Sequence, residues 1–431
     1  MIVIYSKKQE KMKKAILSIL SLFLATTQIA VAQNDCGDRF QTPIFSDVTV
    51  TQDVPYGSNT EAGGTLKDLK FDFYEPTGDD LEKRPLIIWA HGGSFLGGDE
   101  NSGDIVELCE EFSKRGYVNA SINYRLLSFP YILGQISAGV PIDEVFFDGV
   151  VKAVGDMRAA VRFFRQDAAT DNIYNIDPNQ IYVGGASAGA VMAIHTAYLT
   201  TESDFDNYTA LDGMQYINAN GGFEGDSGND GYSSAVSGVV NLCGAAGSVD
   251  FIQANEVPIV SIHGDADNTV PYATDLVSVS GFDVIEMDGS FTINQHANDI
   301  GLQSELWTLP NQDHMAHSNA TNFPQTVEFV SEFLYPLIIC EDNTGIAEDM
   351  ENGEILTVYP NPAENIVNIS LETNHISTIH VSIYDNVGRL VKSFDSPQQN
   401  FSFDSSELAA GIYHINLSNE KQNISRKLVI K

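Results

Sequence analysis

The amino-acid sequence predicts an α/β fold, with a mostly parallel sheet and helices on both faces, followed by a small all-β sandwich of the immunoglobulin-like kind. The first part is predicted by strand-like apolar runs that alternate with amphipathic helix-like runs, from about residue 47 to residue 338. The second part is predicted by short alternating segments, separated by turn residues, over 355–431. A length of 431 residues also favours two globular parts over one.

The first 32 residues have the pattern of a secretory signal peptide. Lysines at positions 11, 13 and 14 precede an apolar run over 15–29, and Ala30-Val31-Ala32 is a small-x-small cleavage signal. The apolar run is too short to span a bilayer, so we expect an exported chain with no stable membrane span. The formal net charge of −35 argues against nucleic acid and anionic membrane surfaces as partners, because both would be repelled.

The predicted elements of the larger domain, residues 33–340, follow in order. Two antiparallel strands open it, and the first helix ends at Gly116, a residue that commonly terminates helices. We expect strands over 47–55, 69–75, 85–90, 117–124, 180–184, 236–241, 257–262 and 304–309, and helices over 104–115, 145–169, 188–199, 289–302 and 324–337. Residues 127–144 interrupt the alternation, and 201–232 predict a loop. The acidic, polar segment 341–354 predicts a linker to the C-terminal domain, residues 355–431.

Four cysteines in an exported chain suggest disulfides, although four allow three pairings. Cys36 and Cys340 bracket the larger domain, so a bond between its two ends is the preferred pair. Cys109 lies in a predicted helix and Cys243 just after a predicted strand, and either one fits a buried thiol that packs as a small hydrophobe. No cysteine or histidine spacing predicts a metal site.

Ser187 is the predicted nucleophile. The sequence Gly-Ala-Ser-Ala-Gly at 185–189 follows an apolar strand and opens a helix, and this context distinguishes the motif from a chance match. The tight turn exposes the serine hydroxyl above the carboxyl edge of the sheet, where ligands bind in open α/β sheets. The helix that follows favours developing negative charge at its N-terminus.

The sequence His-Gly-Gly-Ser-Phe at 91–95 follows the third predicted strand and predicts an oxyanion hole. Glycines let backbone N–H groups approach a substrate oxygen, so Gly93 and Ser94 are the expected donors together with Ala188. Each such donor stabilises the transition state by about 3 kcal/mol. His91 is interpreted as a structural residue that orients this loop.

The catalytic acid is expected in the loop 263–271, after the strand 257–262. This loop offers Asp265, which suits an Asx turn, and Asp267, whose later position reaches toward the next loop. We favour Asp267, with Asp250 after the preceding strand as a more distant candidate.

The catalytic base is expected after the acid, in the chain order Ser, Asp, His. Histidines in the C-terminal domain, inside helices or beside the acid loop are set aside: His375, His380, His414, His195, His296 and His263. His314 and His317 remain, in the loop after the strand 304–309. We favour His314, which is nearer the strand end, and keep His317 as the alternative base.

Residues 84–338 resemble the carboxylesterase branch of the α/β-hydrolases related to hormone-sensitive lipase and to feruloyl or acetyl esterases. The motifs that carry the resemblance lie at 91–95, 123–125, 156–163, 176–178, 184–189 and 263–271. The resemblance implies hydrolysis of carboxylic esters without a metal or cofactor. The chain departs from the pattern at Ser94, where a third glycine is usual, and at Asp313, where glycine commonly precedes the histidine.

Residues 355–431 resemble the type A C-terminal sorting domain of the bacterial type IX secretion system. The matching residues lie at 359–363, 383–385, 388–389, 408–413 and 427–431. This resemblance implies the secretion machinery as a partner and export through the periplasm and outer membrane of a Gram-negative, Bacteroidetes-type bacterium.

The function expected from these features is that of a secreted serine esterase acting on small-molecule or polymer-linked esters. A lipase or polyester hydrolase of the same fold is a variant of this interpretation. A prolyl-oligopeptidase-like exopeptidase shares the fold but normally carries a large N-terminal propeller, for which the chain has no room. A catalytically inactive binding protein is the remaining class, against which the complete Ser, Asp and His set argues.

Overall fold

The computed structural model of the chain describes residues 36–205, 211–340, 355–359, 363, 366–372, 379–385, 389–396, 398, 400–418 and 423–430. The expected signal peptide and linker lie outside these residues. The chain divides between Ile339 and Cys340 into two compact units. No helix in the described ranges has both the length and the apolar character that a membrane crossing requires.

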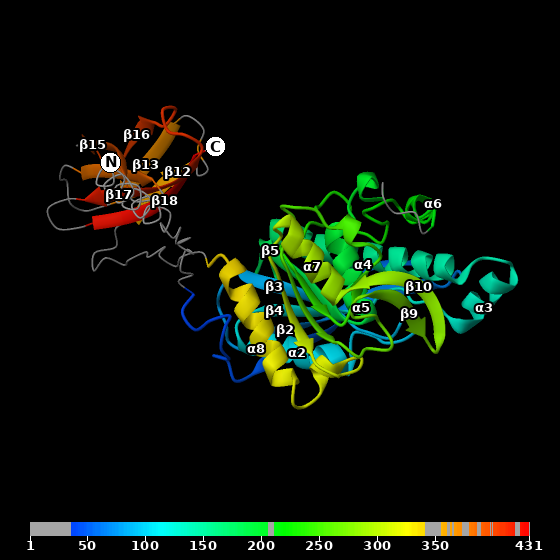
Figure 1. Cartoon of the computed structure of the whole chain (residues 1–431). Helices are drawn as coiled ribbons and strands as arrows, with labels where there is room; N and C mark the ends of the chain where they lie inside the picture. The colour runs from blue at the N-terminus through cyan, green and yellow to red at the C-terminus, as the bar shows by residue number, and fades with distance from the viewer. Residues whose placement is uncertain are drawn as a thin grey trace, which may run out of the picture. The chain divides into compact units, whose positions relative to one another are not determined.

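The N-terminal unit is built on an eight-stranded sheet (Figure 1). Its strands are β1 (Val48–Thr60), β2 (Leu66–Pro76), β3 (Arg84–Ala90), β4 (Val118–Ile122), β5 (Ile176–Ala186), β6 (Val239–Leu242), β8 (Ile259–Gly264) and β11 (Ser304–Leu309). They lie in the order β1-β2-β4-β3-β5-β6-β8-β11. β1 and β2 are antiparallel, β2 pairs antiparallel with β4, and all later pairs are parallel. The predicted fold class and its antiparallel opening are therefore confirmed.

The strand order reverses beside β3, and this reversal places helices on both faces of the sheet. The chain first moves from β3 to β4 toward one edge, then returns past β3 to β5 and continues to β11. Because parallel crossovers are right-handed, the two directions put their helices on opposite faces. Figure 1 shows α2 (Gly103–Lys114) beside α8 (Phe323–Leu334), and α4 (Ile142–Ala169), α5 (Ala188–Tyr198) and α7 (Ser290–Ile300) on the other side.

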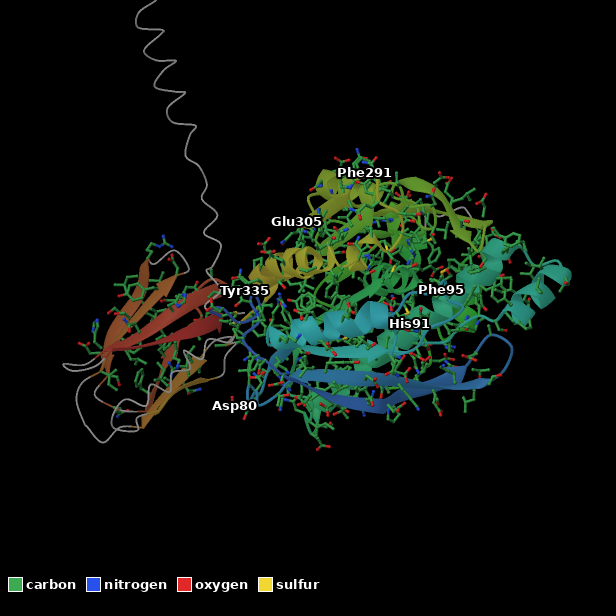
Figure 2. All side chains as sticks on the ribbon, turned by 90° about the horizontal axis from the view of Figure 1, so that it is seen from below. Asp80, His91, Phe95, Phe291, Glu305 and Tyr335 are labelled. Atoms are coloured by element: carbon green, nitrogen blue, oxygen red, sulfur yellow. The ribbon has the colours of Figure 1, made fainter. Side chains whose placement is uncertain are left out.

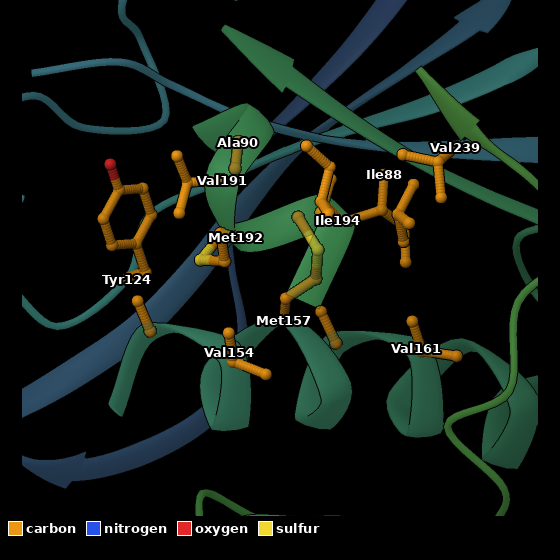
Figure 3. Close-up of a cluster of buried hydrophobic side chains, with 14 of the residues drawn as sticks. Ile88, Ala90, Tyr124, Val154, Met157, Val161, Val191, Met192, Ile194 and Val239 are labelled. Carbon is orange, nitrogen blue, oxygen red and sulfur yellow. The ribbon is translucent and has the colours of Figure 1, made fainter. Parts of the chain in front are cut away.

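The core beneath α4 and α5 holds the carboxyl ends of the central strands in place. α4 buries Val154, Met157 and Val161, whose spacing of three and four residues puts them on one helical face (Figure 3). They pack against Met192 of α5 and Ile88 of β3. Burial of each such side chain stabilises the fold by about 1.5–3 kcal/mol.

The structure adds a hairpin that the sequence analysis missed. β9 (Thr274–Val279) and β10 (Phe282–Gly289) pair antiparallel, and β10 also pairs with the two-residue strand β7 (Ala245–Ala246). Ser280 and Gly281 form the turn, with φ angles of 52° and 81°. Two consecutive positive φ angles are typical of a type I′ hairpin turn, so this dipeptide between alternating segments was the signal that could have predicted the hairpin.

The segment expected to be a loop, 201–232, contains the short helix α6 (Met214–Ala219), and the segment 127–144, which interrupts the predicted alternation, contains α3 (Phe129–Ser137).

The predicted disulfide between Cys36 and Cys340 is confirmed. Cys109 and Cys243 are buried free thiols.

The C-terminal unit consists of two antiparallel sheets, β12-β13-β16 and β15-β14-β17-β18. Their strands are β12 (Ile355–Tyr359), β13 (Ile366–Glu372), β14 (Ile379–Asp385), β15 (Leu390–Ser396), β16 (Asn400–Asp404), β17 (Gly411–Ser418) and β18 (Asn423–Ile430). Buried side chains from both sheets, including Ile369, Val381 and Ile415, form the core between them. The predicted β-sandwich is confirmed, with three strands (β12, β15 and β16) added to the four expected.

Candidate active site

Ser187 occupies a strained turn between β5 and α5. Its φ and ψ angles are 53° and −117°, and its backbone N–H donates to the carbonyl of Leu242 at 2.8 Å. A left-handed backbone at a residue other than glycine costs about 1–3 kcal/mol and persists only where the surrounding structure enforces it. Here α5 starts directly against β3: a Cβ atom at Gly189 would lie 2.0 Å from the Ala90 carbonyl oxygen. The glycine of the motif is required by that close approach.

Ser187, His314 and Asp267 form a continuous hydrogen-bonded chain. His314 Nε2 lies 2.8 Å from Ser187 Oγ, and His314 Nδ1 lies 2.6 Å from Asp267 Oδ2. These residues are 127 and 47 positions apart in the sequence. The parallel pairing of β8 with β11 sets the loops that carry Asp267 and His314 side by side. The Asp313 carboxylate, which accepts from the amides of Asn268 and His314, ties the two loops together.

Asp267 is a fully buried carboxylate with every lone-pair direction used. Its Oδ1 accepts from the amides of Thr269 at 2.8 Å and Val270 at 3.0 Å. Its Oδ2 faces both His314 Nδ1 and, at 3.1 Å, His263 Nε2. Burial raises the pKa of Asp267, but the hydrogen bonds from the two histidines outweigh burial and hold its pKa below its ordinary value. The side chain is therefore an ionised carboxylate in one fixed orientation.

His263 is a second histidine of the site, and the sequence analysis missed its role. It was set aside as a base because it sits at the end of a strand, and the structure shows that it contacts Asp267 instead of Ser187. Its Nδ1 lies 2.7 Å from Ser290 Oγ, which also accepts from Asn241 at 2.9 Å. Since His263 has no exposed surface, this network determines its orientation. Its position four residues before Asp267 was the signal in the sequence.

The pKa of His314 lies above its ordinary value of 6.5. Burial lowers the pKa of this imidazole, but hydrogen bonds and charge from Asp267 and Cys243 outweigh burial by stabilising the charged form. A carboxylate in this position also keeps the imidazole proton on Nδ1 and leaves Nε2 free to accept the Ser187 proton.

The loop after β3 carries the expected oxyanion donors. Gly93, Ser94 and Phe95 all have positive φ, at 111°, 57° and 59°. In the part of the chain that the structure describes, the amides of Gly93 and Ser94 donate to no protein acceptor. Ala188 is the first residue of α5, so its amide also lacks an intrahelical acceptor. Ser94, Ala188 and Ser187 line the same cavity.

His91 lies beneath this loop and faces no reacting group. Figure 2 shows it near Phe95, on the segment that follows β3. The ring stacks on Tyr124 with centroids 4.3 Å apart, and its Nδ1 lies 2.6 Å from the Gly92 carbonyl oxygen. Burial lowers the pKa of His91, so the ring is neutral. These contacts fit the predicted structural role.

The other sequence candidates lie away from Ser187 Oγ. His317 is 1% exposed, and within the described residues neither of its ring nitrogens has a hydrogen-bond partner. Asp265 is exposed and accepts from the amide of Asn311, as expected for a turn residue. Asp250 lies in a short 3₁₀ helix and its amide donates to Ser248. The geometry thus brings together Ser187, Asp267 and His314, and leaves His317, Asp265 and Asp250 out of the hydrogen-bonded chain.

An apolar cavity opens beside Ser187. Its walls come from the loop after β3, from α4 and α5, from the loop after β8 and from the β9–β10 hairpin: Phe95, Phe146, Val150, Val191, Val270, Val277, Val279, Val284, Ile285 and Met287. A second apolar cavity shares Phe146, Val150, Ile285 and Met287 with the first and extends to Arg158 and His195. No charged side chain lines the cavity beside Ser187 among the described residues.

A known family model matches each of the two parts of the chain. Residues 71–138 and 147–220 match the BD-FAE family model, and residues 357–431 match the secretion system C-terminal sorting domain. Both resemblances inferred from sequence motifs are confirmed, and the sorting domain confirms a secreted or cell-surface protein. With its sheet and its strand–serine–helix turn, the N-terminal unit has the α/β-hydrolase fold.

The individual proteins that resemble this chain share low sequence identity with it or match only a short part of it. Gut esterase 1 of Caenorhabditis elegans is 30% identical over 111 residues, which are 25% of this chain and 17% of that protein. The chain therefore matches about one sixth of the length of that relative. Esterase 2 of Thermogutta terrifontis, phosphoramylated by tabun, is 20% identical over 68% of this chain and 96% of its own, with a TM-score of 0.47. Its propionate-bound form is 20% identical over 64% and 92%, with a TM-score of 0.44.

Proposed function

We propose that the protein is a secreted serine hydrolase of carboxylic esters, which acts through Ser187, His314 and Asp267 and a covalent acyl-enzyme. The observation that carries the proposal is the position of His314, whose two ring nitrogens lie 2.8 Å from Ser187 Oγ and 2.6 Å from Asp267 Oδ2. The BD-FAE family match supports the same reaction class.

The reaction begins with His314 Nε2, which takes the proton of Ser187 as Oγ attacks the ester carbonyl carbon. The imidazolium is stabilised by Asp267, which stays ionised throughout. His314 then donates its proton to the departing alcohol, and the C–O bond to that alcohol breaks. Water attacks the acyl-enzyme with His314 again as base, His314 returns the proton to Ser187 Oγ as the bond from Oγ to the acyl carbon breaks, and the carboxylic acid leaves.

The negative charge on the carbonyl oxygen is held by the amides of Gly93, Ser94 and Ala188. These donors are supported by the free amides of the loop and by their place in the cavity beside Ser187. Preorganised donors of this kind lower the barrier because they need no reorientation as the charge develops.

The substrate is an ester with an apolar, uncharged acyl group. The cavity beside Ser187 is walled almost entirely by hydrocarbon side chains, and burying a charged acyl group there without a partner would be costly. The β9–β10 hairpin supplies five of these side chains, Val277, Val279, Val284, Ile285 and Met287, and so defines the size of the acyl site.

The test is turnover of p-nitrophenyl butyrate by the full chain and by its Ser187→Ala variant, with Ser203→Ala, an exposed serine, as the matched control. We expect Ser187→Ala to lose activity by at least about 10³-fold and Ser203→Ala to behave as the parent. A fluorophosphonate should label the parent on the peptide that contains Ser187 and leave the Ser187→Ala variant unlabelled. Equal turnover by the parent and Ser187→Ala would refute the proposal.

A further inference from the structure

Cys243 lies next to the proposed triad and takes no part in the proposed reaction. It follows β6, has a φ angle of 50°, and is 1% exposed. Its amide donates to the Ile262 carbonyl, and its Sγ lies 3.7 Å from Met315 Sδ in the loop that carries His314. The thiol is free, so its sulfur is available as a ligand.

The ligand atoms of Cys243, Asp267 and His314 all lie within 4.8 Å of one another. In a tetrahedral zinc site with one sulfur ligand, with bonds of about 2.0 Å to nitrogen and oxygen and about 2.3 Å to sulfur, neighbouring ligand atoms are about 3.3–3.5 Å apart. To surround one ion, His314 Nδ1 and Asp267 Oδ2, now 2.6 Å apart, would separate and the more distant ligand atoms would approach, by shifts of about 1 Å. Thiolate, imidazole and carboxylate are the three ligand types that zinc takes in proteins.

His317 provides a second, independent observation that supports a cation at this site. It lies three residues after His314 in the same loop, whose Met315 Sδ is 3.7 Å from Cys243 Sγ. The ring is almost fully buried, and in the described part of the chain both of its nitrogens lack a hydrogen-bond partner. A buried polar group without a partner is costly, and an ion that the nitrogen can coordinate removes that cost.

We propose that Cys243, Asp267 and His314, with His317 beside them, form a binding site for a soft divalent cation such as Zn²⁺, and that the bound ion inhibits the hydrolase. The binding part of this proposal stands on the ligand cluster alone, whereas inhibition rests on the proposed function. Hard cations such as Mg²⁺ and Ca²⁺ are excluded by the chemistry of the set, because they prefer oxygen ligands.

Inhibition follows from the chemistry of the His314 ring. A neutral imidazole that carries a metal on Nδ1 keeps its proton on Nε2, and one that carries a metal on Nε2 has no lone pair left there. In both cases Nε2 cannot accept the Ser187 proton. Binding at Nδ1 moves the His314 proton from Nδ1 to Nε2 and releases one proton from the Cys243 thiol to solvent, so charge and protons balance.

Binding is tested directly with Co²⁺, whose absorption reports its ligands, on the full chain with its disulfide intact. We expect a thiolate-to-cobalt charge-transfer band in the near ultraviolet for the parent, for Ser187→Ala and for Cys109→Ala, the other buried free cysteine and the matched control. We expect no such band for Cys243→Ala. A band that survives in Cys243→Ala, or its absence from the parent, overturns the site.

Zinc binding is measured separately by calorimetry and by inhibition of p-nitrophenyl butyrate turnover after chelator treatment. Each variant is compared with its own zinc-free rate. We expect the zinc dissociation constant to rise at least about tenfold in Cys243→Ala and in His317→Leu, and the inhibitory concentration to rise in parallel. Zinc binding without inhibition overturns the inhibitory part. A protein that binds Co²⁺ through Cys243 but hydrolyses no ester contradicts the proposed function and leaves the metal site intact.

Discussion

His263 Nε2 lies 3.1 Å from Asp267 Oδ2, the same oxygen that faces the proposed catalytic base. The carboxylate is therefore held from two sides, and His263 is held in turn by Ser290. This arrangement makes His263 a positioning residue, because it acts on the base only through Asp267.

His263→Phe is expected to lower kcat by about 10- to 100-fold with little change in KM, because Asp267 loses one of the donors that fix its orientation. The carboxylate also becomes more basic, which raises the pKa of His314 and moves the acid limb of the pH profile to higher pH. His263→Gln, whose amide can still donate, should recover part of the rate. The measurement is kcat and KM across pH, with His296→Gln as a control outside the site. An unchanged acid limb in His263→Phe contradicts the positioning role.

The choice between the two candidate bases is tested by single substitutions. His314→Ala is expected to reduce kcat/KM by at least about 10³-fold, because it removes the only imidazole within hydrogen-bonding distance of Ser187 among the described residues. His317→Ala should reduce kcat/KM by less than about tenfold, because its ring nitrogens form no hydrogen bond with Ser187 or Asp267. Steady-state kinetics in the presence of a chelator distinguish the two. A larger loss for His317→Ala would reverse the assignment.

The pH dependence of the reaction follows from the environment of His314. The base is active only when neutral, and Asp267 raises its pKa above the ordinary 6.5. Activity should therefore be lost as the pH falls through that raised value, so the acid limb of kcat/KM has its midpoint above pH 6.5. A pH–rate profile from 5 to 10, measured without free metal ions, checks this. A midpoint at or below pH 6.5 is incompatible with the expected effect of Asp267.

The apolar acyl site predicts a preference for longer acyl chains over acetyl. Each additional buried methylene contributes about 0.8 kcal/mol, or about a fourfold gain in kcat/KM while the cavity still accepts it. We expect turnover of p-nitrophenyl esters to rise from acetate to butyrate, and Val191→Phe, which fills the cavity from α5, to reverse this order. If turnover by the parent does not rise from acetate to butyrate, the cavity does not hold the acyl group.

Gly189 is expected to be indispensable for folding of the serine turn. The Cβ atom of Gly189→Ala would lie 2.0 Å from the Ala90 carbonyl oxygen, a contact that only a backbone shift relieves. We expect a loss of at least about 3 kcal/mol in the free energy of unfolding. Gly103→Ala, at the start of α2, is the matched control, because its added Cβ meets nothing within 4 Å. Denaturant unfolding compares the two, and equal stabilities contradict the steric argument.

Much of the fold could be predicted from residue patterns because its signals are local. Buried strands are apolar runs in the sequence, and α4 has apolar residues at helical spacing. The turn around Ser187 needs glycines that are visible in the sequence. The β9–β10 hairpin was missed because its strands are partly exposed and their alternation is weak. Its turn dipeptide, Ser280-Gly281, was the clearer signal.

The sequence by itself determined which residue types were available for catalysis, their order along the chain, and the exported fate carried by the C-terminal domain. It left two histidines as candidates for the base and gave His263 no role. Only the tertiary structure decided which of them faces Asp267 and Ser187, because the pairing of β8 with β11 sets two loops, 47 residues apart at Asp267 and His314, within hydrogen-bonding distance. The parallel pairing of β6 with β8 brings Cys243 to Asp267 and His314. Hydrogen bonds and metal coordination depend on distances of a few ångströms between residues far apart in the chain, and such distances are set by packing of the whole sheet.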